Sequence, residues 1–408
     1  MNKFIKLIVC VLSLVLGVGG GAGVMWYNSL PETEELILGE ELFYTYNEEQ
    51  ELSTVSLKGE DGELSVHFLE LGNKYTGDCT YIRYGTTDIL IDCGSKSSSI
   101  SYVSDYLKNY MQDDVIEYCI VTHAHTDHFA GFTTTKNSMF ELFNYRTIID
   151  FGSATNKDAS SGALKKYITN RNKAVSNGAT HFDASTEVDE CNNKVFEIGT
   201  NGEVKLEILY NYYYDHSISG TENNYSVCAL LTYNRKSFLF TGDLEEHGSE
   251  GETKLLQYNQ SLQDIKNNGE QYGVDLYKAG HHGSKTSSSQ AFIGAIRPRV
   301  VCVCCCAGSE EYTDAIDNQF PTQHFIDVIS NHTELIYVTT LCVDWENDQF
   351  TSMNGNIVVI TTANGDFGVE CSNNKTVLKD TEWFNRTITV DDVERPMRVW
   401  RPGYLTSE

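Results

Sequence analysis

Three histidines and an aspartate occur within one short run, Thr122-His123-Ala124-His125-Thr126-Asp127-His128. The chain of 408 residues has only 11 histidines, so random placement would almost never give this density. Imidazole and carboxylate groups are ligands for divalent metals such as zinc. The run therefore predicts a metal site, and it restricts the chain to folds that can bring further ligands to the same place.

The residues on either side of this run predict how it is presented. Glu117–Val121 is mostly apolar and β-prone, which predicts a buried strand with His123 and His125 at its end, two residues apart and on the same side. Asp127 and His128 then begin a turn into a helix. We expect the first pair to bind one metal and the second pair another, about 3.5–4 Å away. A structural zinc site, the alternative, more often uses four cysteines or two cysteines and two histidines.

Two later segments supply the remaining ligands. Lys236–Asp243 is a predicted strand that ends in Gly-Asp, so Asp243 is placed where it can bridge both metals. Asp275–Ser284 is again a strand, followed by a glycine turn and two histidines. One or both of His281 and His282 complete the ligand set, and the sequence leaves that choice open. The residues predicted to hydrogen-bond a phosphate oxygen, unless they form a plain surface loop, are Ser284, Lys285 and Thr286.

In this order the three motifs resemble the metallo-β-lactamase superfamily, and the His-His-Gly-Ser form resembles the extracytoplasmic hydrolase domain of the competence protein ComEC. Val66–Gly72, Asp78 and Asp88–Gly94 resemble the opening β-hairpin of that family, and Asn223–Val227 resembles its Asn-Asn-x-Ser strand start. The resemblance covers about residues 64–362. It implies an α/β fold, the αββα metallo-β-lactamase sandwich, in which Asn224 and Ser226 line the cleft.

The predicted mechanism is hydrolysis by a water molecule that two metals activate. Zinc and manganese both suit a mixed set of imidazole and carboxylate ligands. The metals lower the pKa of a bridging water and neutralise the charge that develops on the phosphoryl group. Asp127 also orients that water, so Asp127 and Asp243 are the predicted catalytic residues. The complete predicted ligand set is His123, His125, Asp127, His128, Asp243, His281 and His282.

Several features depart from the family pattern. Asn73–Thr76 separates the opening glycine from the following Gly-Asp, and this loop lies over the site in the family. The expected closing Asn-x-x-x-His-Pro element is replaced by Asn318–Pro321, with His324 displaced. Many superfamily members carry a further ligand histidine before the Gly-Asp motif. His181 and His216 are the candidates here, although polar loop histidines are more often solvated surface groups.

The identity of the phosphodiester substrate stays open. A formal charge of −27 should repel the phosphate backbone of nucleic acid, which argues against a processive nuclease, although a metal cleft can reverse the field locally. The insertion at residues 150–225 is similar in kind to that of pneumococcal-type phosphorylcholine esterase. In that reading Tyr210–Tyr214 forms a cation-binding wall for choline, whereas the alternative is a tyrosine-rich strand packed on the core.

Other function classes also stay open at this point. The same metals activate water for acyl chemistry, so an acyl ester, lactam or lactone hydrolase is one alternative. A non-catalytic binding protein on the cell surface is another. The sequence indicates no protein partner.

The N-terminal end predicts an attachment to the membrane. Lys3 and Lys6 precede Leu7–Tyr27, an uncharged stretch long enough to cross a bilayer. Lysines before this stretch place the catalytic domain outside the cell membrane, or free of it if the stretch is a cleaved signal peptide. The predicted segments are a membrane anchor or signal peptide at 1–27, an acidic linker at 28–60, the hydrolase domain at 61–365 and a C-terminal extension at 366–408.

Cysteines crowd one predicted strand, Val300–Cys306. Alternate side chains of a strand point to opposite faces, so neighbouring cysteines pair poorly as disulfides. We expect a buried strand that uses cysteine as a small hydrophobic residue. Cys302 and Cys305 have the spacing of a metal site, but no second such pair exists to complete four ligands.

The C-terminal extension differs in composition from the acidic body of the chain. Its aromatic residues and arginines either dock on the domain or contact a wall polymer or a membrane. The residues in question are Trp383, Phe384, Arg386, Arg395, Arg398, Trp400 and Arg401.

Overall fold

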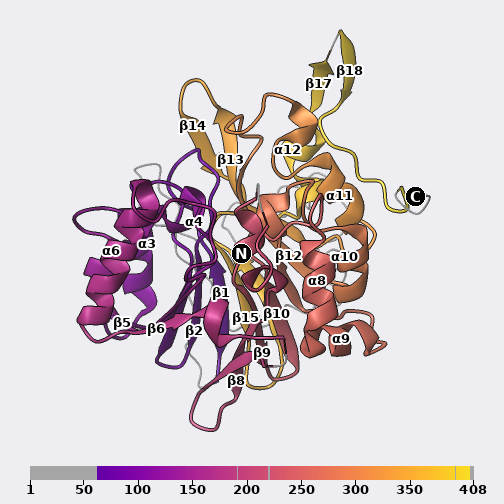
Figure 1. The fold of residues 1–408 in the computed structure, drawn as a ribbon. Coiled ribbons are helices and arrows are strands. Elements are labelled where there is room, and N and C mark those ends of the chain that lie inside the picture. The colour runs from indigo at the N-terminus through magenta and orange to yellow at the C-terminus, as the bar shows by residue number, and fades with distance from the viewer. Residues whose placement is uncertain (1–61, 191, 219–220, 391, 405–408) are drawn as a thin grey trace, which may run out of the picture. The chain divides into compact units, whose positions relative to one another are not determined.

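A computed structural model describes residues 62–190, 192–218, 221–390 and 392–404 (Figure 1). The predicted membrane segment at 1–27 and the predicted linker at 28–60 lie outside the described residues. Among the described helices, none is both long enough and apolar enough to span a membrane.

The first of two large sheets has eight strands in the order β16-β15-β1-β2-β3-β4-β5-β6. Strands β3 to β6 run parallel, and β16, β15, β1, β2 and β3 pair antiparallel. The strands are β1 Leu64–Phe68, β2 Thr80–Tyr84, β3 Thr87–Ile91, β4 Val115–Val121, β5 Asn144–Asp150, β6 Thr180–Asp183, β15 Ile357–Thr361 and β16 Phe367–Cys371.

The second sheet also has eight strands, in the order β14-β13-β12-β11-β10-β9-β8-β7. Strands β10 to β13 run parallel, and the remaining neighbours pair antiparallel. The strands are β7 Lys194–Ile198, β8 Val204–Leu209, β9 Cys228–Tyr233, β10 Lys236–Phe240, β11 Leu276–Lys278, β12 Val300–Ala307, β13 Ile336–Asp344 and β14 Gln349–Ser352.

Helices cover the outer faces of the two sheets, and Figure 1 shows α3 and α6 on one side and α8 to α11 on the other. The predicted α/β sandwich of helix, sheet, sheet and helix layers is therefore confirmed. The helices are α3 Ser99–Tyr110, α4 Thr126–Phe129, α5 Met139–Leu142, α6 Gly162–Ser176, α7 Ala184–Glu187, α8 Gly251–Tyr258, α9 Gln260–Asn267, α10 Gln290–Ile296, α11 Gln323–Ile329 and α12 Glu382–Asn385. A small hairpin, β17 Thr387–Val390 and β18 Val393–Pro396, follows α12.

Strand β12 confirms the interpretation of the cysteine-rich segment. All of its residues are buried, and Cys302 and Cys304 belong to the apolar cluster between the two sheets. Cys305 belongs to the cluster beneath the helices on the opposite face. The ten described cysteines are all free and buried, so these thiols fill the core and Cys302 and Cys305 face opposite ways.

The chain beyond residue 365 is built into the same domain. Strand β16 extends the first sheet up to Cys371, so the sheet continues past the predicted boundary at residue 365. Trp383 and Phe384 then enter the apolar cluster beneath α8 to α11. Arg398 is only 2% exposed, and it donates hydrogen bonds to backbone carbonyls. Of the two interpretations of the C-terminal residues, packing on their own domain is the one that the structure shows.

The tyrosine-rich segment does not form the strand that the sequence suggested. Strand β8 ends at Leu209, and Tyr212–Tyr214 forms a 3₁₀ helix instead. The Asn211 side chain accepts a hydrogen bond from the backbone N–H of Tyr213 and so caps this helix. Tyr212 stacks on His216 and on Tyr258. The predicted strand is therefore wrong, because local capping overrides the β propensity of tyrosine, but Tyr210 and Tyr213 are buried and Tyr210 belongs to the core, as the packing interpretation predicts. The binding of choline by this segment stays a prediction.

Candidate metal centre

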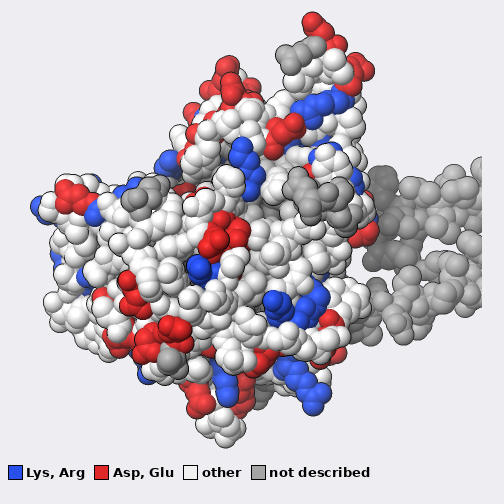
Figure 2. All heavy atoms as spheres, turned by 45° about the vertical axis from the view of Figure 1, so that its right-hand side comes forward, with Lys and Arg blue, Asp and Glu red and all other residues white. Residues whose placement is uncertain are grey.

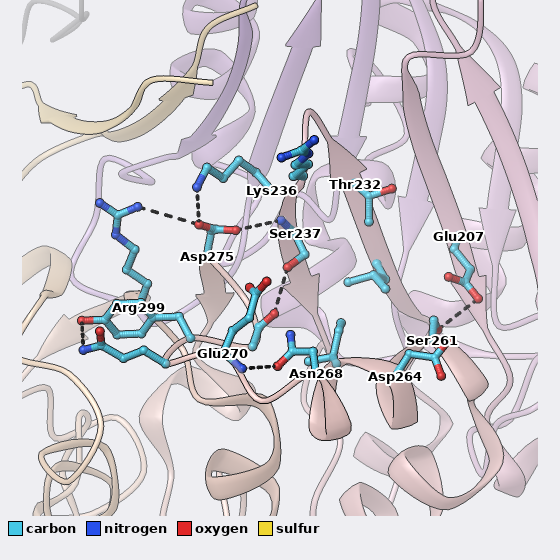
Figure 3. Close-up of a pocket in the computed structure, with 16 residues that line it drawn as sticks. Glu207, Thr232, Lys236, Ser237, Ser261, Asp264, Asn268, Glu270, Asp275 and Arg299 are labelled. Carbon is cyan, nitrogen blue, oxygen red and sulfur yellow. Dashed lines mark hydrogen bonds and ion pairs between the residues drawn. The ribbon is translucent and has the colours of Figure 1, made fainter. Parts of the chain in front are cut away.

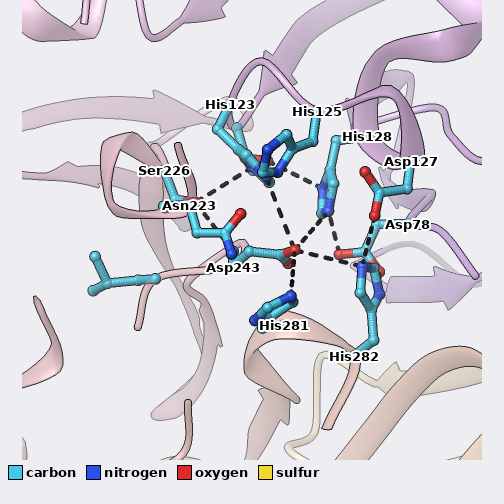
Figure 4. A network of polar contacts seen from close by, with 12 residues as sticks. Asp78, His123, His125, Asp127, His128, Asn223, Ser226, Asp243, His281 and His282 are labelled. Carbon is cyan, nitrogen blue, oxygen red and sulfur yellow. Dashed lines mark hydrogen bonds and ion pairs between the residues drawn. The ribbon is translucent and has the colours of Figure 1, made fainter. Parts of the chain in front are cut away.

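The predicted ligands lie together in the loops that follow three of the strands, and Figure 4 shows their side chains pointing toward one another. His123 and His125 follow β4, Asp243 follows β10, and His281 and His282 follow β11. Helix α4 begins directly after His125 and carries Asp127 and His128. Parallel strands end at the same edge of a sheet, so the two sheets together gather ligands that are distant in the sequence.

The Asp127-His128 turn needs glycine beside it. The backbone N–H of Asp78 donates to the carbonyl of Asp127, and the N–H of Cys93 donates to the carbonyl of His128. A Cβ atom at Gly94 would lie 1.6 Å from the Asp127 carbonyl oxygen. Only glycine allows this close approach, which holds the opening hairpin against the ligand run.

One carboxylate oxygen, Oδ2 of Asp243, is the meeting point of four imidazoles. It lies 3.1 Å from Nε2 of His128 and 3.5 Å from Nε2 of His282. Nε2 of His123 and Nε2 of His281 both lie 3.9 Å from it. The predicted bridging position of Asp243 is thus the geometric centre of the cluster, and both histidines of the His281-His282 pair point to it.

Each of these imidazoles is held by its other nitrogen. Nδ1 of His128 donates to Asp92, 2.7 Å away, and Nδ1 of His282 donates to the carbonyl of Cys304, 2.9 Å away. Nδ1 of His281 lies 3.1 Å from a Glu245 carboxylate oxygen. Nδ1 of His123 lies 3.1 Å from the Thr122 hydroxyl, which itself donates to Asp92. Such partners fix the tautomer that leaves Nε2 free to bind a metal, as is usual for metal-ligating histidines.

The ligand atoms divide into two neighbouring groups. Asp127, His128, Asp243 and His282 form one group, whose ligand atoms all lie within 4.8 Å of one another. His123 and His125 stand next to it, with 3.0 Å between Nε2 of His123 and Nδ1 of His125. Oδ2 of Asp243 lies 3.9 Å from Nε2 of His123, and Asp78, Asp92 and His128 form a further group of possible ligands, so the arrangement is compatible with a dinuclear metal site.

The chemistry of the cluster favours positive charge at its centre. Both carboxylate oxygens of Asp243 and the Nε2 atoms of His128 and His282 are buried and form no hydrogen bond with any described residue. Burial lowers the pKa of His282, but the carboxylates of Asp243 and Asp78 outweigh it and raise that pKa to about 10. Burial opposes charge on His128 as well, yet Asp243 and Asp92 raise its pKa well above the usual value. Divalent cations fit this donor set because they supply that charge directly.

Sequence reasoning missed several residues that complete the centre. Lys278, which is buried on β11, forms an ion pair with Asp78 and lies 3.9 Å from Oδ1 of Asp243. The Tyr312 hydroxyl donates to Oδ2 of Asp127 over 2.9 Å. The sequence places Asp78 and Asp92 only in the opening hairpin and gives them no role at the metals. Their positions at the ends of predicted elements are the one sequence feature that could have predicted a role at the metal centre. No feature of the neighbouring sequence predicts such a role for Lys278 or Tyr312.

The predicted substrate-binding residues have other partners in this structure. The Thr286 hydroxyl donates to Glu245, and Ser284 bonds to Thr286. Lys285 donates to Asn318 and is exposed. Oδ1 of Asn224 accepts from the backbone N–H of Glu245, and the Ser226 hydroxyl accepts from the backbone N–H of Asp243; both side chains are fully buried. Asn224 and Ser226 therefore position the Asp243 loop, and a direct contact of any of the five residues with substrate stays a prediction.

The other candidate histidines lie elsewhere. His216 is exposed and stacked on Tyr212, and His181 forms an ion pair with Asp150. Neither belongs to a ligand group among the described residues. His324 is exposed at the start of α11, whereas the Phe320 ring lies 5.8 Å from that of His281. The additional loop at Asn73–Thr76 contacts the β13–β14 turn, where Lys74 forms an ion pair with Asp348.

Replacing Asp92 tests the support of His128. In Asp92→Asn the neutral amide is a weaker acceptor for Nδ1 of His128, and metal affinity should fall by roughly 10- to 100-fold, the usual cost of losing such a partner. Competition with a chelator measures the affinity. Asp105→Asn, on the exposed face of α3, is the control and should bind metal as the wild type does. Equal affinities of the two variants would contradict this role.

Glu252 makes stability depend on pH near the His281-His282 loop. Its carboxylate accepts hydrogen bonds from the backbone N–H groups of Ser288 and Ser289, but burial outweighs them and raises its pKa to about 7. A carboxyl group whose pKa is raised in the folded state stabilises the fold below its unfolded pKa, and loses that contribution as pH rises through its folded pKa. Between pH 4.5 and pH 7 the free energy of unfolding of the wild type should fall by ~3 kcal/mol relative to that of Glu252→Gln. Urea unfolding of both proteins across this range measures the difference, and parallel pH profiles would contradict it.

Comparison with known proteins finds one family model and several similar solved structures. Residues 72–136 match the family model of the metallo-beta-lactamase superfamily. No curated protein matches the sequence significantly. Among solved structures, the metallo-beta-lactamase fold protein YhfI from Bacillus subtilis is 10% identical, with a TM-score of 0.38 over 69% of this chain and 96% of its own. Human tRNase Z, short form, is 15% identical, with a TM-score of 0.33 over 59% of this chain and 92% of its own.

A third similar structure is CmlA, a diiron beta-hydroxylase from Streptomyces venezuelae, which is 14% identical with a TM-score of 0.33 over 61% of this chain. The match spans 46%, about half, of the CmlA chain. Residues 72–136 match the metallo-beta-lactamase superfamily model, and the two large sheets and the ligand groups form a metallo-β-lactamase-like fold with metal-binding residues. This fold carries the metal-binding residues of a metal-dependent hydrolase.

Proposed function

We propose that this protein is a phosphodiesterase that hydrolyses small phosphodiesters with two divalent cations, zinc or manganese. The observation that carries the proposal is the convergence of four supported imidazoles on Oδ2 of Asp243, with Asp127 beside them. His123 and His125 would hold one cation, Asp127, His128 and His282 the other, and Asp243 both. His281 would complete the first group.

The residues of the chain have distinct parts in the proposed reaction. Cations bound there would supply a hydroxide at neutral pH and neutralise charge on the phosphoryl group. Asp127 accepts a hydrogen bond from Tyr312, which leaves its second oxygen to orient the attacking water. Lys278 offsets the charge of Asp78 and Asp243. Although the Tyr312 residue is exposed as a whole, desolvation of its hydroxyl and the neighbouring carboxylate of Asp127 raise the pKa of Tyr312 above its usual value, so the hydroxyl stays a donor near the reacting group.

Two arguments favour a small phosphodiester over other substrates. The His281-His282-Gly283-Ser284 motif resembles that of a phosphodiester hydrolase, which favours phosphoryl over acyl chemistry. Binding to nucleic acid relies on basic surfaces that release counterions. The chain has a net charge of −27, and on the face shown in Figure 2 acidic groups interrupt the basic ones. A long polyanion is therefore disfavoured, whereas a small phosphodiester needs only the metal centre.

Turnover of a set of substrates by the full-length chain tests this function. Bis(p-nitrophenyl) phosphate, single-stranded DNA and p-nitrophenyl acetate are compared in zinc and in manganese, with Asp243→Asn as the inactive control. We expect metal-dependent hydrolysis of the small phosphodiester alone. Cleavage of DNA at a comparable rate would replace the proposal with a nuclease, and hydrolysis of the acetate ester alone would replace it with an acyl hydrolase.

A further inference from the structure

A polar pocket adjoins the metal centre at His125. It has a volume of about 440 Å³, and its lining includes Lys157, Thr221, Glu222, Asn223 and Glu245. His125 is a candidate ligand, and Glu245 supports His281. A substrate whose phosphorus lies at the metals can therefore extend into this pocket.

Two loops far apart in the sequence are fastened together to form the pocket wall. The Asn156 side chain donates to the carbonyls of Ile218 and Thr221, at 3.0 and 3.2 Å. The backbone N–H of Asn156 donates to Oε2 of Glu222 over 2.8 Å. The Thr221 hydroxyl donates to Glu245, 3.0 Å away. These bonds hold Glu222 and Glu245 in place before any ligand binds.

Two residues of the wall have buried hydrogen-bond acceptors that lack donors in the described part of the chain. Glu222 is 5% exposed, and its Oε1 has no hydrogen-bond partner among the described residues. Oδ1 of Asn223, which is 7% exposed, likewise lacks a partner in the described part of the chain. A buried acceptor without a donor costs free energy, which a ligand that brings N–H groups recovers.

Charge decides which ligand fits. Lys157 also lines the pocket, but it is exposed and therefore screened by solvent, whereas the Glu222 carboxylate is buried. The pocket interior is thus negative, and its rim carries one positive charge that can meet a phosphoryl oxygen. A zwitterion with an ammonium group and a phosphodiester matches both. Among the described residues the pocket lining contains no Phe, Tyr or Trp, whereas quaternary ammonium groups are usually held by the faces of these side chains.

On these grounds, and resting on the proposed phosphodiesterase function, we infer that the pocket binds the primary ammonium head group of the substrate through Glu222 and Asn223. The substrate class is then a phosphodiester of an amino alcohol such as ethanolamine. Choline, which has no N–H donor, is disfavoured.

A second pocket differs from the pocket at His125 because its acidic side chains already have partners within the protein. It is lined by Lys236, Asp275, Arg299 and Glu207, among others, and shares no residue with the pocket at His125 (Figure 3). Asp275 lies 3.1 Å from Lys236 and 3.8 Å from Arg299, so its charge is already compensated within the protein. Glu207 there accepts hydrogen bonds from Asn193 and Ser261, and it provides a matched control for Glu222.

The test compares three p-nitrophenyl phosphodiesters that differ in their second group: ethanolamine, choline and methanol. The metal-loaded full chain should hydrolyse the ethanolamine ester with a kcat/KM about 10- to 100-fold above that of the methyl ester, which is the worth of a hydrogen bond to a charged group. Glu222→Gln should remove this preference, and Glu207→Gln should keep it. Equal kcat/KM for all three esters, a preference for choline, or a preference that survives Glu222→Gln would overturn the inference.

Two further measurements separate the pocket from the chemistry. If no ester is hydrolysed, the phosphodiesterase proposal fails, and calorimetry with phosphoethanolamine and methyl phosphate then decides on the pocket alone. Tighter binding of phosphoethanolamine that Glu222→Gln abolishes would still support the head-group site, and equal binding of the two would overturn it. If Glu222→Gln does not fold, the preference of the wild type among the three esters decides.

Discussion

Asp243→Asn should reduce metal-dependent turnover by at least ~10²- to 10³-fold, the range seen when one preorganised electrostatic group of an active site is lost. The substitution keeps the shape of the side chain but removes the negative charge on which His123, His128, His281 and His282 converge. Bound metal should also fall, because the predicted bridging ligand is lost from both groups. Turnover of the small phosphodiester and metal content by elemental analysis measure the two effects.

A matched control separates the loss of this ligand from a general effect of removing an aspartate. Asp264→Asn changes a residue of the pocket in Figure 3, where Asp264 accepts a hydrogen bond from Gln260. It should keep its metal and its activity. Wild-type metal content and turnover within a few-fold in Asp243→Asn would show that Asp243 does not bridge.

The ligand run, the Gly-Asp motif and the histidine pair were predictable because each is local. A strand followed by a tight turn fixes where His123, Asp127 and Asp243 point, and the run of motifs resembles a known family. The alternation of Cys302 and Cys305 between two core faces was predictable for the same reason, since strand geometry has a period of two.

The supporting residues could not be predicted, because their roles arise only from contacts across the two sheets. The Asp92 carboxylate reaches His128 from the end of β3, and Tyr312 reaches Asp127 from a loop 185 residues later in the chain. The strand predicted for the tyrosine-rich segment Tyr210–Tyr214 was wrong for a related reason. Asn211 caps a 3₁₀ turn there, and such a local hydrogen bond outweighs a propensity. The pocket at His125 depends on Asn156 and Glu222, whose residue types carry no recognisable motif.

The C-terminal residues support the metal centre through Arg398. The buried Arg398 guanidinium donates to the carbonyls of Ile316, Gln319 and Pro321, with distances of 2.8 to 3.3 Å. These residues flank Phe320, whose ring lies 5.8 and 5.9 Å from the rings of His281 and His282. One side chain of the C-terminal extension therefore fixes a loop that covers two of the predicted ligands.

Arg398→Ala should lower the free energy of unfolding by roughly 3–5 kcal/mol, because it leaves several buried carbonyls without donors at about 1–3 kcal/mol each. Arg395→Ala is the matched control. Arg395 is partly exposed and forms a single ion pair with Asp317, so its loss should cost at most about 1 kcal/mol. Urea unfolding of the two variants measures the difference.

Since the loop around Phe320 also loses its anchor, Arg398→Ala should raise KM under conditions where it is still folded, whereas Arg395→Ala should not. Equal stability of the two variants would mean that the loop is held by its other contacts and that the C-terminal extension only covers the domain.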